Sequence, residues 1–400
     1  MNITLSILAD ELSHYYPGAA ACGGSGFDLT ETAIWHKGDP FDNPSCLYCL
    51  LPEEVPSIVN ENVCLLLTQK TSKMLWLRHY LYLPQCSDLP LAMIRIQRTL
   101  LQLLNWQTKM LRLAARDTDI TELLRISSPI FQNPLSFNSL LHDQIFSDTE
   151  GCRQDTPTWD RLISSFLEQE EKPYLSPETL SESHRKKSPS LFEMPGQKGR
   201  FIIANIFRGS IRIGTLTIAE ENTPLKPCHF TYIKALGECL SMMFEHIPIL
   251  PLDPLSHCLH QLLEGNAVPP EELADACHQF QWEPEGHTYR VAVIRALNKN
   301  TRHLFAADAL FYRNLIARIY SKSKVFLYQD TIVLIRDFTQ HDPLEEDIDS
   351  QDKFNILLKK IDACQGASLP FSVLNQAAIF YEQAKSVAQG IRPATAAPHE

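Results

Sequence analysis

The sequence predicts a multidomain protein of mixed α/β and α+β class, and three observations support this. First, a chain of 400 residues exceeds what one hydrophobic core usually organises, so about two to four domains are expected. Second, short apolar runs bounded by Pro, Gly and Asn alternate with helical patterns along the chain. Third, the proline-rich stretch Pro248–Pro254 separates the last part of the sequence from the rest.

Residues 1–86 are expected to form a small N-terminal α/β domain. The apolar spacing of its first residues predicts an opening helix, which Pro17 and Gly18 stop; its members are Ile3, Leu5, Ile7, Leu8 and Leu12. Strand-like apolar runs follow at residues 33–35, 46–51, 63–68 and 74–83, separated by turn signals.

Residues 88–117 are expected to form a long linker helix. Eight positions are spaced alternately by four and three, like the a and d positions of a coiled coil, and all but one are apolar: Leu89, Met93, Ile96, Leu100, Leu103, Gln107, Met110 and Ala114. One interpretation is a dimer seam, in which Gln107 fixes the register. The other is an amphipathic helix packed on its own domain.

Residues 118–247 are expected to form a sensor domain. A helix at residues 120–126 precedes an apolar segment with a turn at Asn133-Pro134, and a helix is expected at residues 159–168. Residues 170–190 are polar and suggest a loop with a short helix. Apolar and polar residues alternate in the runs 201–207 and 211–218, which predicts a β-hairpin. Residues 228–244 predict a closing amphipathic helix. This element order is typical of GAF- and PAS-like folds.

Residues 255–390 alternate helix and strand around a central hairpin, which favours a ferredoxin-like or nucleotide-cyclase-like sheet. The expected elements are helices to residue 263 and at 271–280, 306–320 and 354–363, with strands at 289–295, 325–328 and 331–336. Residues 391–400 have the composition of a linker.

Charge argues against nucleic-acid binding by these residues. Lys and Arg number 36 against 47 Asp and Glu, a net charge of -11, and the densest basic run, Arg185–Lys187, suggests a solvated loop. Residues 1–6 do not resemble a signal peptide, and no apolar run reaches ~18 residues. We therefore expect a cytoplasmic protein whose eleven cysteines are mostly free buried thiols.

Motifs for catalysis, cofactors or metals are not found. The cluster Gly23–Gly26 has no strand before it and is interpreted as a flexible loop. Cys46-Leu47-Tyr48-Cys49 lies in a strand-like run, which points its thiols to opposite faces and favours structural thiols over a metal site. His257 and His260, and the acidic residues 345–349, are interpreted as solvated or structural. No catalytic, cofactor or metal residue is proposed. Trp159, Phe192 and Phe207 could line an effector pocket or pack in a core, so the pocket stays unassigned.

The last part of the chain resembles a known family. Its opening resembles the degenerate GGDEF-like domain of the PucR/CdaR regulators of purine and sugar-diacid catabolism, at Leu262-Leu263-Glu264-Gly265, Glu272-Leu273, Phe280-Gln281-Trp282 and Tyr289–Val293. Its close is similar to the family's G-x-S…L…A-Y-x-Q-A element, at Gly366–Ser368, Phe371, Ser372, Leu374 and Tyr381–Lys385. The resemblance implies a bacterial transcriptional regulator, an unknown small-molecule effector and a C-terminal helix-turn-helix.

Two departures from related proteins bear on function. The hairpin at residues 325–333 lacks the Gly-Gly turn and the acidic pair that diguanylate cyclases use. The chain ends at Glu400 before any helix-turn-helix. We therefore expect a non-enzymatic sensory and dimerising portion of such a regulator, a homodimer that contacts DNA only through the missing module. The alternatives are a nucleotide-processing GGDEF-type enzyme and an interaction adaptor that never binds DNA.

Overall fold

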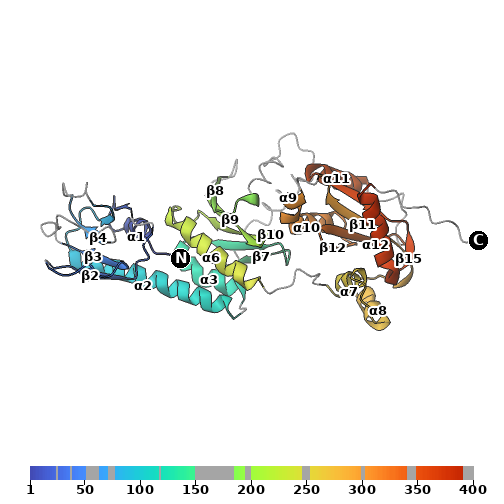
Figure 1. Cartoon of the computed structure of the whole chain (residues 1–400), viewed down its shortest axis with the longest axis horizontal. Helices are drawn as coiled ribbons and strands as arrows, with labels where there is room; N and C mark the ends of the chain where they lie inside the picture. The colour runs from blue at the N-terminus through green and yellow to red at the C-terminus, as the bar shows by residue number, and fades with distance from the viewer. Residues whose placement is uncertain are drawn as a thin grey trace, which may run out of the picture.

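The computed structural model describes residues 1–23, 26–36, 38–50, 63–70, 77–116, 119–148, 184–193, 200–245, 253–298, 302–339 and 348–390. These residues form three five-stranded sheets and ten α-helices, so the protein is of mixed α/β class as predicted. The three sheets follow one another along the long axis of the molecule (Figure 1). No helix in these ranges is long and apolar enough to cross a membrane.

The first sheet contains β1 (Ala20–Cys22), β2 (Glu31–Ile34), β3 (Cys46–Cys49), β4 (Cys64–Leu67) and β5 (Tyr80–Tyr82). Their order is β1-β5-β4-β3-β2, with β2 to β5 parallel and β1 antiparallel to β5. Helix α1 (Leu5–Leu12) covers one face; it begins after Thr4, whose hydroxyl accepts a hydrogen bond from the Ile7 amide. The expected opening helix is present and each expected run contains a strand; in the run 74–83 the strand is residues 80–82, and residues 74–76 lie outside the described residues.

Strand β1 contradicts one expectation, because it directly precedes Gly23, where no strand was expected. Its three residues, Ala-Ala-Cys, are too short to show an alternating pattern. The strand forms because it pairs with β5, which is a tertiary contact that local sequence does not encode.

Helix α2 (Leu89–Ala114) begins at Asp88, whose carboxylate accepts a hydrogen bond from the Leu91 amide. It packs on α1, β2, α3 and α6, and the indole of Trp106 donates to the Ser127 hydroxyl over 3.0 Å. The apolar face of α2 is therefore covered within the chain.

This packing corrects the interpretation of the eight seam positions. Ile96, Leu100, Leu103, Met110 and Ala114 are buried in the chain's own largest core, and Leu89 and Met93 pack against that core. The Gln107 amide donates to the Met1 carbonyl, so it does not set a register between helices. These contacts favour the alternative of an amphipathic helix packed on its own domain, because α1, α3 and α6 cover the buried seam side chains.

The second sheet contains β6 (Leu135–Ser139), β7 (Gln144–Ser147), β8 (Ser190–Glu193), β9 (Arg200–Arg208) and β10 (Ile211–Ala219), antiparallel in the order β7-β6-β10-β9-β8. Helices α3 (Ile120–Phe131) and α6 (Cys228–Met243) flank it. The expected hairpin and closing helix are confirmed. Helix α3 extends through Pro129, past its expected end at residue 126, and the helix expected at residues 159–168 lies outside the described residues.

The third sheet has the order β12-β13-β11-β14, and a further strand pairs with β11. Its elements are α7 (Pro254–Leu263), α8 (Pro270–Gln279), β11 (Glu285–Ala296), α9 (Arg302–Ala307), α10 (Ala309–Ile319), β12 (Lys324–Tyr328), β13 (Thr331–Asp337), α11 (Ile348–Lys360), β14 (Ala363–Ala367), β15 (Phe371–Val373), η3 (Leu374–Gln376) and α12 (Ala377–Ala388). The expected elements are present with two corrections. The helix at 306–320 is two helices, α9 and α10, that break at Asp308. The helix at 354–363 is α11, which begins at Ile348 and ends at Lys360, so Asp349 of the expected acidic loop is helical. The acidic residues 345–347 and the linker 391–400 lie outside the described ranges.

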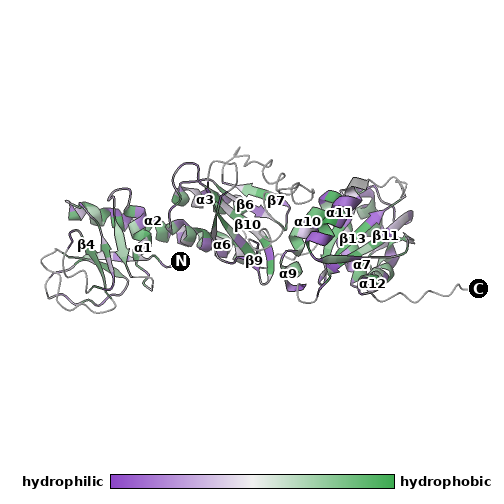
Figure 2. Cartoon of the chain, turned by 90° about the horizontal axis from the view of Figure 1, so that it is seen from above, coloured by the Kyte–Doolittle hydropathy of each residue, from purple (hydrophilic) through white to green (hydrophobic). Residues whose placement is uncertain are grey.

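One apolar core runs through all three parts of the molecule. It includes residues of α1, α2 and α6 and reaches α10 of the third part, while two smaller cores line the other faces of the first and third sheets. Coloured by hydropathy, the strands and the inner faces of the helices carry most of the apolar residues (Figure 2). The continuity of the largest core brings α10 against the second sheet, where the candidate site lies.

Candidate functional site between the second and third sheets

A buried ion pair joins the second sheet to the third part of the chain. The Nε atom of Arg212, in β10, donates to the Oδ1 atom of Asp308 over 2.9 Å, although the residues are 96 positions apart. Both side chains are withdrawn from water: Arg212 is 0% exposed and Asp308 is 2% exposed. Asp308 occupies the break between α9 and α10, and Arg212 precedes a bulge in β10. A buried pair here links the two parts, and removing one partner would leave the other charge buried without compensation.

Both terminal nitrogens of Arg212 also have a polar partner. Its Nη1 atom donates to the Thr215 hydroxyl over 3.1 Å, and its Nη2 atom lies 3.0 Å from the Nδ1 atom of His184. The guanidinium also lies 5.5 Å from the centre of the Phe311 ring on α10, and the His184 ring meets that ring edge-on. The guanidinium is therefore held by groups from both sides of the interface, as a buried charge requires.

The charge states in this cluster follow from its surroundings. Burial would raise the pKa of Asp308, but His184 and the charge of Arg212 outweigh that effect and hold the pKa at about 2. Burial, and next the charge of Arg212, lower the pKa of His184 to about 4. At neutral pH the cluster therefore holds one cation and one anion beside a neutral His184 ring, whose Nδ1 atom lies 3.0 Å from Arg212 Nη2 and 3.5 Å from Asp308 Oδ1.

Helix α10 makes a second set of contacts with the turn between β6 and β7. The Leu140 carbonyl accepts hydrogen bonds from the Arg313 guanidinium over 2.9 Å and from the Asn314 amide over 3.1 Å. The Asp143 carboxylate accepts from Asn314 and pairs with Arg318. Polar groups along α10 thus fix it against the second sheet at two places.

The other end of the middle part meets the N-terminal part at Glu11. The Glu11 carboxylate accepts a hydrogen bond from the Tyr232 hydroxyl over 2.9 Å and lies 3.4 Å from the Lys226 ammonium, at the start of α6. The neighbouring Asp10 has a raised pKa, because burial outweighs its hydrogen bond from the Cys228 amide. The positive end of the helix dipole, at the N-terminus of α6, also stabilises carboxylates at this position.

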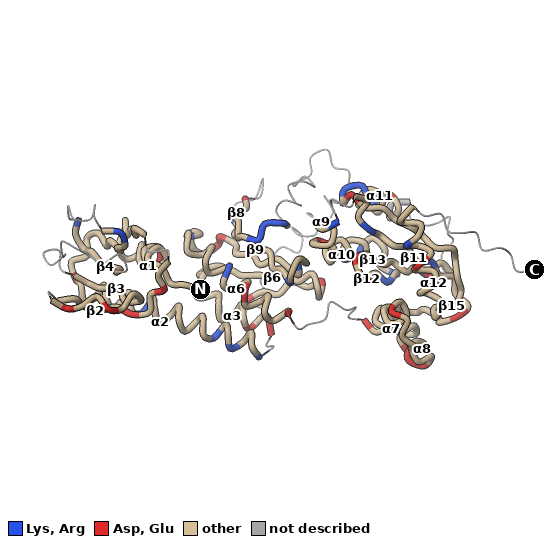
Figure 3. Tube along the Cα trace, viewed as in Figure 1, with Lys and Arg blue, Asp and Glu red and all other residues tan. Residues whose placement is uncertain are grey.

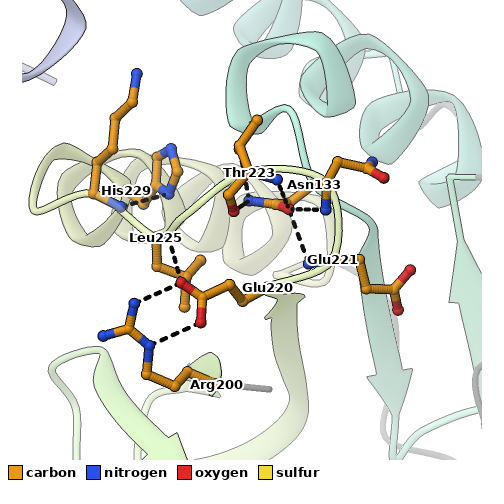
Figure 4. A network of polar contacts seen from close by, with 9 residues as sticks. Asn133, Arg200, Glu220, Glu221, Thr223, Leu225 and His229 are labelled. Atoms are coloured by element: carbon orange, nitrogen blue, oxygen red, sulfur yellow. Dashed lines mark hydrogen bonds and ion pairs between the residues drawn. The ribbon is translucent and has the colours of Figure 1, made fainter. Parts of the chain in front are cut away.

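A polar network fixes the loop that connects β10 to α6 (Figure 4). The Asn133 side-chain oxygen accepts from the amides of Glu221, Asn222 and Thr223 at 2.9 to 3.1 Å. Arg200 and Glu220 pair through two hydrogen bonds, and Glu220 also accepts from the Leu225 amide. Asp308 contacts β10 through Arg212, and Glu11 contacts α6 through Tyr232. Because the loop that joins β10 to α6 is fixed at several points, these contacts form one continuous connection.

The sequence did not identify this site. Arg212 interrupts an apolar strand run, and a charged residue in a strand covered on both faces signals a buried partner. The partners, Asp308 and His184, lie too far away in the sequence for local patterns to reveal them. Of the aromatic residues considered for a pocket, Phe207 pairs with Arg212 across the β9–β10 ladder, Phe192 lies on β8, and Trp159 is outside the described residues.

The motifs considered for metals are separated by the fold. Cys46 and Cys49 belong to different cores on opposite faces of the first sheet, as expected, and burial raises their pKa values to about 11 and about 12. His257 contacts Gln261, while His260 packs edge-on against Tyr328. Among the residues that the structure describes, no three His, Cys, Asp or Glu side chains are grouped as metal ligands.

The β12–β13 turn and the basic run Arg185–Lys187 both lie at exposed positions. The turn between β12 and β13 is Gln329-Asp330, and Asp330 forms an ion pair with Arg302. Arg185, Lys186 and Lys187 are exposed, as a solvated segment would be. Lys and Arg are scattered over the described parts of the chain rather than gathered on one face (Figure 3).

Comparison with known proteins adds no relative. No protein-family model matches the chain, and no curated protein matches it.

Proposed function

We propose that this chain is the sensory and dimerising portion of a bacterial transcriptional regulator of the PucR/CdaR type. In this proposal the middle part is a GAF- or PAS-like domain that binds a small-molecule effector in the cytoplasm, and the third part is a degenerate GGDEF-like domain. A helix-turn-helix after residue 400, implied by the family resemblance, reads the DNA. The observation that carries the proposal is the Arg212–Asp308 pair, because a sensor needs a fixed connection between its sensing and output parts.

The order of the elements supports these domain assignments. In the third part, β11, α9 and α10, β12, β13, α11 and β14 follow the β-α-β-β-α-β order with β11 and β13 central, as in ferredoxin-like folds. The described middle part has α3, the hairpin β6–β7, β8, the hairpin β9–β10 and α6 around one antiparallel sheet, which supports a GAF- or PAS-like domain. The helix expected between the two hairpins lies outside the described residues.

The β12–β13 turn favours a regulator over a cyclase. Cyclase chemistry needs carboxylates free to hold metal and phosphates at this turn. The turn here offers Gln329 and a single carboxylate, Asp330, which forms an exposed ion pair with Arg302. Incubation with Mg²⁺ and GTP is therefore expected to give no product, and turnover that is lost in Asp330→Asn would favour the enzyme instead.

The path from β10 to α10 supplies a mechanism for the regulator. An effector that shifts the second sheet moves Arg212, and the buried pair obliges Asp308 and α10 to follow or to lose their partner. Because an unpaired buried charge is costly, the two parts are expected to switch between discrete arrangements rather than deform gradually. The DNA-reading module, joined to the third part, receives that change.

The test is DNA binding by two versions of the protein at ~150 mM salt, because nonspecific binding grows steeply as salt is lowered. Residues 1–400 alone are expected to bind no promoter DNA, and the chain extended through the gene's next domain is expected to bind saturably. In the extended chain, Arg212→Met with Asp308→Leu, which leaves no charge buried, should uncouple DNA affinity from effector while leaving DNA binding itself intact. Sequence-selective binding by residues 1–400, or an extended chain that binds no DNA, would refute the proposal.

A further inference from the structure

The outer face of α2 is the most apolar exposed helix surface in the described parts of the chain. Four of the twelve exposed large hydrophobic side chains there belong to this helix: Leu91, Ile94, Leu101 and Leu111, which are 40%, 46%, 59% and 46% exposed. Leu91, Ile94 and Leu101 lie on the side away from the seam positions that α1, α3 and α6 cover, whereas Leu111, about five turns after Met93, lies beside that covered side. In Figure 1, α2 runs along the lower edge of the first two parts, and no other labelled element lies beyond it. Apolar groups gathered on an accessible helix mark an interaction surface.

The charges on the same helix are arranged unevenly. Helix α2 contains no Asp or Glu, and its exposed basic residues Arg98, Lys109 and Arg112 lie mostly toward its C-terminal end, which Arg116 follows. The N-terminal end instead carries the exposed carboxylate of Asp88. The apolar Leu91 and Ile94 lie near the acidic end. The N-terminal half of this surface thus carries Asp88, Leu91, Ile94 and Arg98, and the C-terminal half carries Lys109 and Arg112 with long aliphatic stems.

We propose that α2 pairs in antiparallel orientation with α2 of a second copy of this chain, with the twofold axis beside Leu101. Counting from that axis, Leu91 lies opposite the partner's Arg112, and Ile94 lies opposite the partner's Lys109. Their aliphatic stems cover the apolar side chains while the charged ends reach water. Asp88 lies beside the partner's Arg112 and Arg116, so opposite charges and opposite helix dipoles meet at both ends.

Charge decides the orientation and the occupant. Parallel pairing would set Arg98 on the partner's Arg98 and Arg112 on the partner's Arg112, and like charges directly opposed are destabilising. Antiparallel pairing separates these groups along a helix that is about 39 Å long at 1.5 Å per residue. The two halves of the surface complement each other, which is what a twofold interface requires. An acidic partner protein would satisfy the basic half only.

The inference gives a location to the dimer of the proposed function and rests on that function in this respect alone. It does not depend on effector binding or on DNA binding. A dimer held by another surface would therefore refute the inference and leave the proposed function standing.

The first test is the oligomeric state of residues 1–400 by light scattering at tens of micromolar. The wild type is expected to have the mass of two chains, and Ile94→Glu with Leu101→Glu is expected to have the mass of one. The matched control is Leu369→Glu with Ile379→Glu, because these side chains are as exposed but lie on the third part; this variant should stay dimeric. Circular dichroism and the melting temperature verify that both variants remain folded. A monomeric wild type, or a dimer that survives the α2 substitutions, overturns the proposal.

The second test establishes orientation. Leu91→Cys and Arg112→Cys proteins are mixed and oxidised, and the wild type reports any background from exposed Cys22. Antiparallel pairing predicts a mixed disulfide in excess over either homodisulfide. Homodisulfides alone would indicate parallel pairing and contradict the model of the interface. A monomeric wild type that instead binds a polyglutamate peptide through α2 would assign the surface to an acidic partner.

Discussion

The guanidinium of Arg212 and the carboxylate of Asp308 form a hydrogen-bonded ion pair at 2.9 Å inside the contact between the second sheet and α10. Neither side chain reaches water, so separating the two parts would leave two charges either unpaired in the interface or newly hydrated. Removing one charge of this pair, and then both, measures what the pair contributes to the attachment of the third part.

Removing one charge of this pair is expected to be far more damaging than removing a surface charge. Asp308→Asn leaves Arg212 buried without its anion and should lower the free energy of unfolding by about 3–5 kcal/mol. The control is Glu122→Gln, which breaks the exposed Arg125–Glu122 pair on α3 and should cost less than about 1 kcal/mol. Urea unfolding followed by fluorescence measures both. Equal losses in the two variants would mean that the buried pair does not hold the parts together.

Replacing both partners by apolar residues should restore much of the stability. In Arg212→Met with Asp308→Leu no charge is left buried, so the double variant is expected to be more stable than Asp308→Asn alone. The same unfolding measurement, analysed as a double-mutant cycle with the two single variants, reports the coupling between the positions. Additive losses would show that the residues do not interact.

The histidine of the cluster makes stability depend on pH. The pKa of His184 is lowered to about 4 from an ordinary value near 6.5, so the unfolded chain binds a proton between about pH 6.5 and pH 4 while the folded chain does not. Stability is thus full above pH 6.5 and falls as pH drops toward 4. In His184→Asn the slope over this window should decrease by up to about 1.4 kcal/mol per pH unit.

Unfolding curves measured at several pH values test the His184 prediction. A smaller slope remains in the variant because burial also lowers the pKa of His229, to about 4. An unchanged slope in His184→Asn would place this ring outside the buried cluster in solution.

Neighbouring leucines of α2 should respond in opposite ways. Leu100 is buried in the core, so Leu100→Ala should destabilise the protein by about 2–5 kcal/mol. Leu101 faces outward, and Leu101→Ala should change the stability of one chain by less than about 0.5 kcal/mol. Thermal unfolding at low protein concentration, where association contributes least, compares them. A larger loss of stability in Leu101→Ala than in Leu100→Ala would indicate that the seam position Leu100 is exposed and Leu101 is buried.

Gly366 should tolerate no side chain. It lies on β14 under α12, and a Cβ added there would collide with the backbone of Ala384 and Ala388. Gly366→Ala is expected to destabilise the third part by at least about 1–3 kcal/mol. Gly26→Ala is the control, because nothing lies near the added atom and the substitution should be neutral. Calorimetry of the two variants distinguishes them, and a neutral Gly366→Ala would mean that α12 sits farther from β14.

Local patterns predicted most of the elements but not their partners. Apolar periodicity located α1, α2, α6 and the strands β9 to β13 to within a few residues, since each buries one stripe or face. It missed β1 and β8, which are short and are strands only because they pair with β5 and β9. It also joined α9 to α10, because nothing local shows that Asp308 turns away to meet Arg212.

The sequence by itself determined that α2 has one apolar face, that Cys46 and Cys49 point apart, and that the chain is a mixed α/β protein of several parts. Those features depend on residue spacing along a helix or strand. Only the tertiary structure decided that the apolar face of α2 is covered by α1, α3 and α6, and that Arg212, His184 and Asp308 share one site. Burial and charge pairing depend on segments far apart in the chain, and spacing within one segment carries no information about which distant segment will cover it.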